Sequence, residues 1–200
     1  METVTAFIVA GGRSSRMGFD KALLSFRNQT LLERALQTAT AVVPRVVIAG
    51  PRERYAKFGD VVEDIYPDCG PLSGIHSALG VTGTDLNLVL AVDMPLMTPE
   101  FLSWLIMQAG GASELIVVPD ALGGLQPLCA VYRRDLRAVV EQSLQDGDYK
   151  IGHLFTRAPT RYISEAEIRG ADFSPEIFRN VNSPEEYEAL MRCENTTSAR

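Results

Sequence analysis

Glycines and cationic residues gather directly after the first apolar segment of the chain. The stretch IVAGGRSSRMGFDK, residues 8–21, contains Gly11 and Gly12, followed by Arg16 and Lys21. Adjacent glycines permit backbone conformations that a Cβ forbids, and they let main-chain N–H groups approach phosphate oxygens closely. The two cations supply the charge that a phosphate ester needs. The stretch therefore predicts a polyphosphate-binding loop, and the alternative is a plain surface turn with solvated cations.

Two better-known phosphate-binding motifs do not match this loop. A Walker loop needs the pattern GxxxxGK[ST], whereas Gly18 is followed here by Phe-Asp-Lys-Ala. A dinucleotide-binding fingerprint needs GxGxxG, whereas the first two glycines are adjacent and the third lies six residues after Gly12. The spacing excludes both motifs.

A second candidate group is the carboxylate of Asp93. It ends LNLVLAVD, residues 86–93, a nearly unbroken apolar run that is the strongest strand signal in the sequence. A buried carboxylate is costly unless it is paired or bound to a cation. Mg²⁺ prefers hard oxygens and usually takes one or two carboxylates, with phosphates and waters completing its coordination. Asp93 is therefore a candidate Mg²⁺ ligand, and the alternative is that it caps the turn at Thr98.

Strands and helices alternate along the chain and must position these groups. Apolar runs predict strands at 5–10, 45–50, 61–64, 86–93, 114–119 and 126–133, and the segments between them predict helices at 29–42, 74–83, 98–109 and 134–145, with a last helix from Ser183. Continuously apolar strands are typical of a parallel sheet covered on both faces. In such α/β sheets ligands bind outside the carboxyl ends of the strands, which is where residues 10–21 and Asp93 would lie.

The composition is that of an ordinary globular protein. Of the 200 residues, 46% are hydrophobic and 22% are charged, so we expect one domain over residues 1–193 and a disordered tail over 194–200. The three cysteines have no metal-like spacing, which suggests a reducing compartment without structural zinc. We see no basic leader and no apolar run of membrane-spanning length, so we expect a cytoplasmic protein.

The charge is unevenly distributed. The net charge of −6 argues against a general nucleic-acid-binding protein. Residues 1–57 nevertheless contain nine Lys and Arg against four Asp and Glu, whereas residues 58–200 contain ten against twenty-one. This basic first quarter is suited to a small anionic ligand, unless the clustering is chance.

The pattern AGGxxxRMGxDK, residues 10–21, resembles the signature of nucleotidyltransferases that share a Rossmann-like fold. The double glycine with RMGxDK resembles in particular the molybdenum cofactor guanylyltransferase family. Further matches follow in order and span nearly the whole chain: GPLSG at 70–74, VDMPL at 92–96, QPLCAVY at 126–132 and NVNSPEE at 180–186.

The resemblance implies an α/β Rossmann-like nucleotidyltransferase fold with a mostly parallel central sheet and helices on both faces. It implies transfer of GMP from GTP to molybdopterin with release of pyrophosphate, and Mg²⁺ as cofactor. The residues it implies are catalytic Arg16, Lys21 and Asp93, with Asp93 also binding the metal; nucleotide-binding Val9, Ala10, Gly11, Gly12, Lys21, Asp64, Pro71, Gly74 and Asp93; and acceptor-binding Gln126, Asn180 and Asn182.

Some of these positions have simpler interpretations. Asp64 could be a solvated carboxylate, and one of the two asparagines could cap the following helix. Ala49 departs from the family, some members of which carry a nucleotide-contacting asparagine there; the backbone, or the first loop and GPLSG, would then recognise the base. His76 and His153 are interpreted as packed helix residues and are left out of the site.

Two rival functions remain open at this point. One is a cytidylyltransferase or a sugar-nucleotide or isoprenoid-precursor pyrophosphorylase, although those families tend to carry alanine where this chain has Gly11. The other is a nucleotide sensor or a scaffold for molybdoenzyme assembly, which would not need to keep Lys21 and Asp93 together. The expected partners are GTP and molybdopterin, with other molybdenum-cofactor biosynthesis proteins and apo-molybdoenzymes as further candidates, and neither nucleic acid nor membrane.

Overall fold

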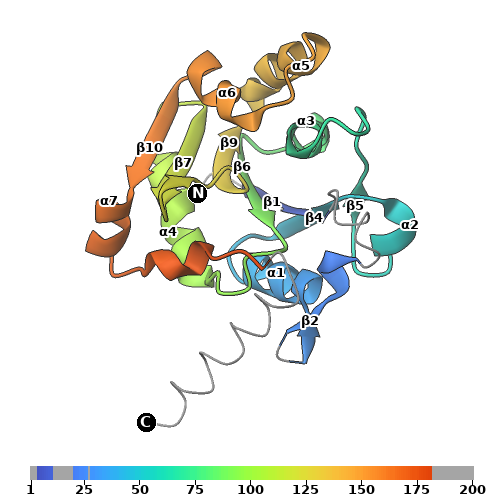
Figure 1. Ribbon diagram of the computed structural model, residues 1–200, viewed down its shortest axis with the longest axis horizontal. Coiled ribbons are helices and arrows are strands. Elements are labelled where there is room, and N and C mark those ends of the chain that lie inside the picture. The colour runs from blue at the N-terminus through green and yellow to red at the C-terminus, as the bar shows by residue number, and fades with distance from the viewer. Residues whose placement is uncertain (1–3, 11–19, 27, 182–200) are drawn as a thin grey trace.

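The computed structural model describes residues 4–10, 20–26 and 28–181, in which a central sheet is covered by helices on both faces (Figure 1). The strand order is β10-β7-β9-β6-β1-β4-β5, and β8 pairs with β7 at the side of this path. The strands are β1 (Val4–Val9), β4 (Arg45–Ala49), β5 (Val61–Val62), β6 (Leu86–Ala91), β7 (Ile116–Ala121), β8 (Gly124–Leu125), β9 (Cys129–Arg133) and β10 (Thr160–Ser164).

The sheet is mostly parallel, as predicted. Strands β5, β4, β1 and β6 run parallel to one another, and β10 runs parallel to β7. The exceptions are the two-residue strand β8, which pairs antiparallel with β7, and β9, which pairs antiparallel with both β6 and β7. Only residues 122–128 separate β7 from β9, and a parallel return would need a crossover of roughly a dozen residues or more. The short connection therefore forces β9 to run the other way.

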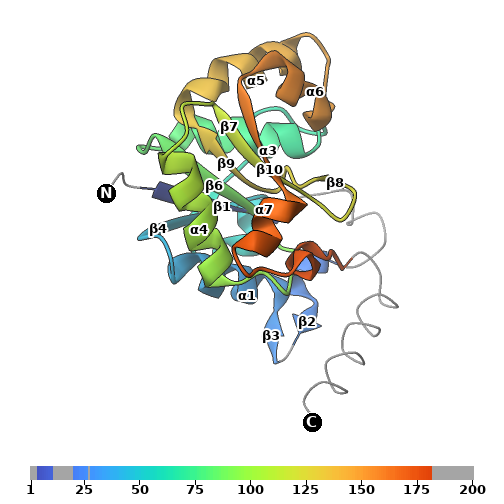
Figure 2. The ribbon, with the colours of Figure 1, turned by 90° about the vertical axis from the view of Figure 1, so that its left-hand side faces the viewer.

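The helices form a layer on each side of the sheet. Figures 1 and 2 show α3 (Pro71–Val81), α5 (Arg137–Gln145) and α6 (Ile151–Arg157) on one side, and α1 (Leu31–Thr40) and α4 (Pro99–Gly110) on the other. The fully buried strand β1 contributes side chains to the cores on both faces of the sheet. Ala6 and Ile8 pack in the core under α1 and α4, whereas Val9 packs in the core under α3 and α5. This two-sided burial explains why β1 is continuously apolar.

Shorter elements complete the described chain. They are η2 (Lys21–Leu23), the hairpin of β2 (Ser25–Phe26) and β3 (Gln29–Thr30), α2 (Arg52–Tyr55), η3 (Arg134–Leu136), α7 (Glu165–Gly170) and η4 (Pro175–Phe178). Within the described ranges no helix has both the length and the apolar character that a membrane crossing requires.

Local signals set where the helices begin. Thr98 caps α4, because its side chain accepts a hydrogen bond from the Phe101 N–H. Helix α3 begins at Pro71 rather than at residue 74. Gly70 turns into it at φ 70°, a left-handed conformation that favours glycine, and proline is preorganised for the first helical position. The GPLSG segment is therefore the first turn of α3 and not a loop before it.

An aromatic cluster fastens the last described segment to α4. The Phe101 ring lies 5.1 Å from the Phe178 ring and 5.3 Å from the Phe173 ring, both edge to face, and Trp104 packs against Phe173. Phe101 and Phe178 are buried. Such aromatic pairs combine a large apolar burial with a preferred geometry. The cluster positions residues 179–181, which follow η4, so that the backbone reaches Asp93.

Candidate functional site

The parallel strands place their carboxyl ends at one edge of the sheet. Val9 pairs with Ala49 on one side and with Ala91 on the other, so β1, β4 and β6 end at the same level. Beyond this level the Ala10 N–H donates to the Ala49 carbonyl at 3.0 Å, and the Val92 N–H donates to the Val9 carbonyl at 3.3 Å. The predicted binding edge is therefore held by backbone hydrogen bonds right up to the first residues after each strand.

Lys21 and Asp93 meet at this edge. The Lys21 Nζ lies 2.7 Å from the Asp93 Oδ2, and the two side chains are 13% and 22% exposed. Lys21 begins η2, which Asp20 caps by accepting a hydrogen bond from the Ala22 N–H at 3.1 Å. A short, partly buried ion pair of this kind orients both groups, and it presents a cation and a carboxylate side by side. The sequence prediction that the two lie together is confirmed.

Asp93 does not cap α4, since Thr98 takes that role. Its carboxylate faces Lys21, and its carbonyl accepts a hydrogen bond from the Val181 N–H at 2.9 Å. The Arg34 guanidinium donates to the carbonyl of Pro95 in the same turn. Asp93 is thus held by η2 and by the segment after η4, and α1 holds the turn that follows it.

Asp64 lies after β5, which is shorter than predicted and ends at Val62. One oxygen of its carboxylate is 3.7 Å from where a Cβ on Gly74 would be, so Asp64 stands against the first turns of α3. The side chain is exposed, yet the protein atoms around the carboxyl group desolvate it and raise its pKa. Asp64, Pro71 and Gly74 therefore form one contiguous group at this edge.

The acceptor-side predictions have a mixed outcome. Asn180 is exposed and directly precedes Val181, so the Val181–Asp93 hydrogen bond brings it beside Asp93. The Gln126 side-chain amide instead donates to the carbonyls of Ala121 and Gly124, at 2.9 and 3.1 Å. Its NH₂ group therefore braces the β7–β8 connection, which leaves its side-chain oxygen for a ligand.

Four predicted site residues lie outside the described ranges. They are Gly11, Gly12, Arg16 and Asn182. Val9 and Ala10 are described, and the Ala10 carbonyl accepts a hydrogen bond from the Tyr55 hydroxyl at 3.0 Å.

Sequence reasoning missed Asp20 and Tyr55. The Tyr55 hydroxyl lies 2.9 Å from both carboxylate oxygens of Asp20, and Arg54 lies 3.8 Å from one of them. The place of Asp20 inside the RMGxDK signature could have marked it as a site residue, whereas the distribution of charges did not distinguish it from other carboxylates. Tyr55 carried no such signal, because a tyrosine in RERY reads as an ordinary helix residue.

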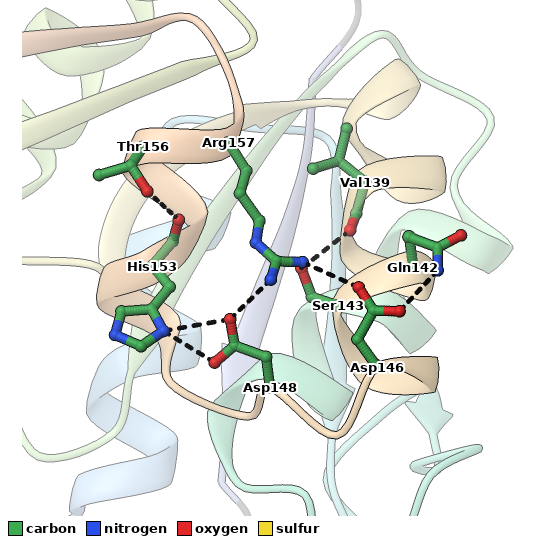
Figure 3. A network of polar contacts seen from close by, with 8 residues as sticks. All are labelled: Val139, Gln142, Ser143, Asp146, Asp148, His153, Thr156 and Arg157. Atoms are coloured by element: carbon green, nitrogen blue, oxygen red, sulfur yellow. Dashed lines mark hydrogen bonds and ion pairs between the residues drawn. The ribbon is translucent and has the colours of Figure 1, made fainter.

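The two histidines lie away from this constellation. His76 is buried in α3, where its ring meets Tyr66 edge to face at 5.1 Å. His153 is an exposed residue of α6, not the packed one expected, and its Nδ1 lies 2.8 Å from Asp148 (Figure 3). Arg157 joins the same network through Asp146 and Asp148, which ties α6 to the end of α5. These ion pairs explain the network structurally, since they hold α6 against the end of α5.

No group of three or more His, Cys, Asp or Glu side chains that could hold a metal ion occurs within residues 4–10, 20–26 and 28–181. A metal at Asp93 would therefore need further oxygens from elsewhere, as Mg²⁺ takes from nucleotide phosphates and water.

The comparisons with known proteins agree with this arrangement. Residues 6–161 match the family described as MobA-like NTP transferase domain. A relative from Clostridium perfringens, named probable molybdenum cofactor guanylyltransferase, is 35% identical over 94% of this chain and 96% of its own length. A relative from Desulfosudis oleivorans, named molybdenum cofactor guanylyltransferase, is 32% identical over 94% of each chain.

The fold comparison points the same way. The crystal structure of molybdopterin-guanine dinucleotide biosynthesis protein A from Archaeoglobus fulgidus superposes with a TM-score of 0.82 at 24% identity, covering 98% of this chain and 100% of that one. With the sequence matches, this establishes a Rossmann-like nucleotidyltransferase fold. The chain belongs to the MobA-like NTP transferase family, alongside the molybdenum cofactor guanylyltransferases.

Proposed function

We propose that the protein transfers GMP from GTP to molybdopterin, releasing pyrophosphate and forming the molybdopterin guanine dinucleotide cofactor. The observation that carries this proposal is the pairing of Lys21 with Asp93 at the edge where β1 and β6 end. The names of the curated relatives support the same reaction and the same two substrates.

In this proposal GTP lies across the carboxyl ends of β1, β5 and β6, with its phosphates over residues 11–21. Asp64 and the first turn of α3 form the far side of the nucleotide site, where the helix N-terminus favours negative charge. The nucleotide-binding residues would be Val9, Ala10, Gly11, Gly12, Lys21, Asp64, Pro71, Gly74 and Asp93.

The reaction is an in-line displacement at the α-phosphorus. A terminal phosphate oxygen of molybdopterin forms a bond to this phosphorus while the bond to the β-phosphate oxygen breaks, and pyrophosphate leaves with that electron pair. The attacking phosphate is already anionic, so the reaction needs no general base. Lys21 and Arg16 donate hydrogen bonds to the phosphate oxygens. Catalysis then rests on positioning and on neutralising the developing charge.

The donor set at Asp93 fits a magnesium ion. Asp93 offers one hard, partly exposed carboxylate whose charge already needs a cation beside it, and the other ligands would come from phosphates and water. Asp93 would hold the ion, which when bound neutralises charge on the phosphate oxygens. Mg²⁺ dependence is therefore part of the proposal.

The acceptor would lie on the side of Asp93 that faces the segment after η4. Asn180 is exposed there, and Asn182 follows two residues later in the sequence. Carboxamides offer both donors and acceptors, which suits the polar ring and the phosphate of molybdopterin. Gln126 would contribute through its carbonyl oxygen, since its NH₂ group is engaged.

The proposal also covers the compartment, the domain organisation and the protein partners. We place the protein in the cytoplasm as a single domain over residues 1–193, able to meet other molybdenum-cofactor biosynthesis proteins and apo-molybdoenzymes. The net charge of −6 disfavours nucleic acid as a partner.

The test is pyrophosphate release from each of the four nucleoside triphosphates, with Mg²⁺ and molybdopterin as acceptor. GTP should support turnover and the other three should not. Preference for CTP would instead identify a cytidylyltransferase. Tight GTP binding without pyrophosphate release would indicate a nucleotide sensor or scaffold, and Asp93→Asn is the matched inactive control.

A further inference from the structure

The hydroxyl group of Tyr55 lies between two parts of the candidate site. Tyr55 ends α2 and is only 1% exposed. Its hydroxyl oxygen is 3.0 Å from the Ala10 carbonyl oxygen and 2.9 Å from each carboxylate oxygen of Asp20. Ala10 and Asp20 are the residues that precede and follow the segment 11–19. One buried side chain thus contacts both residues that flank segment 11–19.

These three oxygens are all hydrogen-bond acceptors, so they converge on a single donor. A carbonyl and a carboxylate repel each other at close range unless a donor stands between them. The phenol must keep its proton to serve as that donor. Burial, reinforced by the hydrogen bond and the charge of Asp20, raises the pKa of Tyr55, so the hydroxyl remains neutral.

Asp20 links the Tyr55 hydroxyl to the pair of Lys21 and Asp93. Its carboxylate caps η2 at the Ala22 N–H, and the residue that follows it is Lys21. Lys21 in turn pairs with Asp93 at 2.7 Å. The adjacent Arg54 lies 3.8 Å from the Asp20 carboxylate, so two consecutive residues of α2 face this aspartate. The contacts run without a gap from α2 through Asp20 and η2 to Asp93.

We propose that Tyr55 is a positioning residue for nucleotidyl transfer, whose hydroxyl holds Asp20 against the end of β1 and thereby sets Lys21 beside Asp93. It does not touch the substrate. The geometry that supports it is the convergence of Ala10 and Asp20 on one buried donor. This inference rests on the proposed function, because it assigns Tyr55 a part in the same reaction.

The variant that tests it is Tyr55→Phe, which removes the hydroxyl and keeps the ring. Tyr132→Phe is the matched control, because Tyr132 is also fully buried and its hydroxyl donates to a carbonyl, that of Pro127, at 2.7 Å. Both variants should unfold at a lower temperature than the parent. Only Tyr55→Phe should lower kcat/KM for GTP, by roughly tenfold or more, as expected for loss of a buried hydrogen bond to a charged group.

A double-mutant cycle with Lys21→Ala distinguishes an effect of Tyr55 on the position of Lys21 from a general loss of stability. If Tyr55 acts through Lys21, adding Tyr55→Phe to Lys21→Ala should cost less than about threefold further in kcat/KM. Asp20→Ala should resemble Tyr55→Phe and should be similarly non-additive with it. The control Tyr132→Phe should show no such coupling to Lys21.

Two results would overturn the proposal while the parent enzyme remains active. One is a Tyr55→Phe enzyme whose kcat/KM for GTP is within twofold of the parent value. The other is a double variant in which Tyr55→Phe lowers kcat/KM by the same factor in the Lys21→Ala background as in the parent. If the parent released no pyrophosphate from any triphosphate, the proposed function would fail and this inference with it. Parent turnover therefore distinguishes the two failures.

Discussion

Lys21 and Asp93 are 72 residues apart in sequence and 2.7 Å apart in the fold. The two side chains are 13% and 22% exposed, so the ion pair compensates part of the hydration that each charge has lost. When one partner of such a pair is removed, the remaining charge is left poorly compensated. At residue scale, the pair therefore matters to both the stability and the chemistry of the site.

Lys21→Ala should lower kcat/KM for GTP by roughly two orders of magnitude, about 3 kcal/mol of transition-state stabilisation. The physical reason is the loss of one charged donor to the phosphate oxygens. Steady-state pyrophosphate release measures it, and Lys57→Ala is the control because Lys57 is exposed near the end of α2. Near-parental kcat/KM in Lys21→Ala would contradict the mechanism.

His76 should make folding stability depend on pH. Burial first, and then the charge of Arg137, lower its pKa below the ordinary value of 6.5, against an opposing effect of Glu141. Within the described chain both ring nitrogens and the Ser73 hydroxyl are buried without a hydrogen-bond partner. The unfolded chain therefore binds the proton more tightly than the folded one, so stability is lost as pH falls below about 6.5 toward the lowered value.

Urea unfolding of the parent and of His76→Leu at several pH values between about 7 and 5 checks this prediction. The parent should lose stability over this range more steeply than the variant, because carboxylates contribute equally to both. Equal pH slopes in the two proteins would show that His76 is not responsible.

At the scale of elements, the segment from α7 to Val181 depends on its aromatic anchor. Phe178 of η4 packs edge to face on Phe101 of α4, and three residues later the backbone reaches the carbonyl of Asp93. The position of Asn180 therefore follows from packing on α4, and not from any local preference of residues 179–181.

Phe178→Ala should lower the free energy of unfolding by about 3–5 kcal/mol, as is typical for a large aromatic removed from a core. It should also raise KM for molybdopterin more than KM for GTP, because Asn180 loses its support. Phe173→Ala is a suitable comparison, since Phe173 is only partly buried and lies before η4, and it should have the smaller effect on both. Equal losses of affinity for both substrates would argue against a specific role on the acceptor side.

At the scale of the whole molecule, two apolar cores lie on opposite faces of one sheet, and the candidate site lies at the edge where both end. Residues from η2, the turn after β6 and the segment after η4 contact one another there, and the start of α3 lies beside Asp64 at the same edge. A ligand that contacts all of these elements will stabilise the folded state as a unit.

GTP with Mg²⁺ should raise the unfolding temperature by roughly 5–10 °C at about 100 times the dissociation constant, where binding contributes about 2.7 kcal/mol. Thermal denaturation with and without the ligands measures this shift. Chelation of the metal should remove most of it, and the shift should be reduced in Asp93→Asn. A shift that survives chelation intact would contradict a metal held between Asp93 and the phosphates.

The primary structure was enough to predict the parallel strands β1, β4, β5, β6 and β7, and to place Lys21 and Asp93 at their carboxyl edge. Buried strands are continuously apolar, and parallel strands share an edge, so Lys21 and Asp93 could be placed together before any coordinates. Strand β10 escaped prediction because it lies at the end of the sheet and only Ile163 in it is buried, so it lacks a continuous apolar run.

Long-range contacts account for what remained hidden. The hydrogen bond from the Val181 N–H to the Asp93 carbonyl depends on which segments meet in space. The same holds for Tyr55, whose hydroxyl reaches Ala10 and Asp20 across 45 and 35 residues of chain. Local patterns encode burial and turn geometry, whereas a hydrogen bond between distant segments exists only once packing has brought its donor and acceptor together.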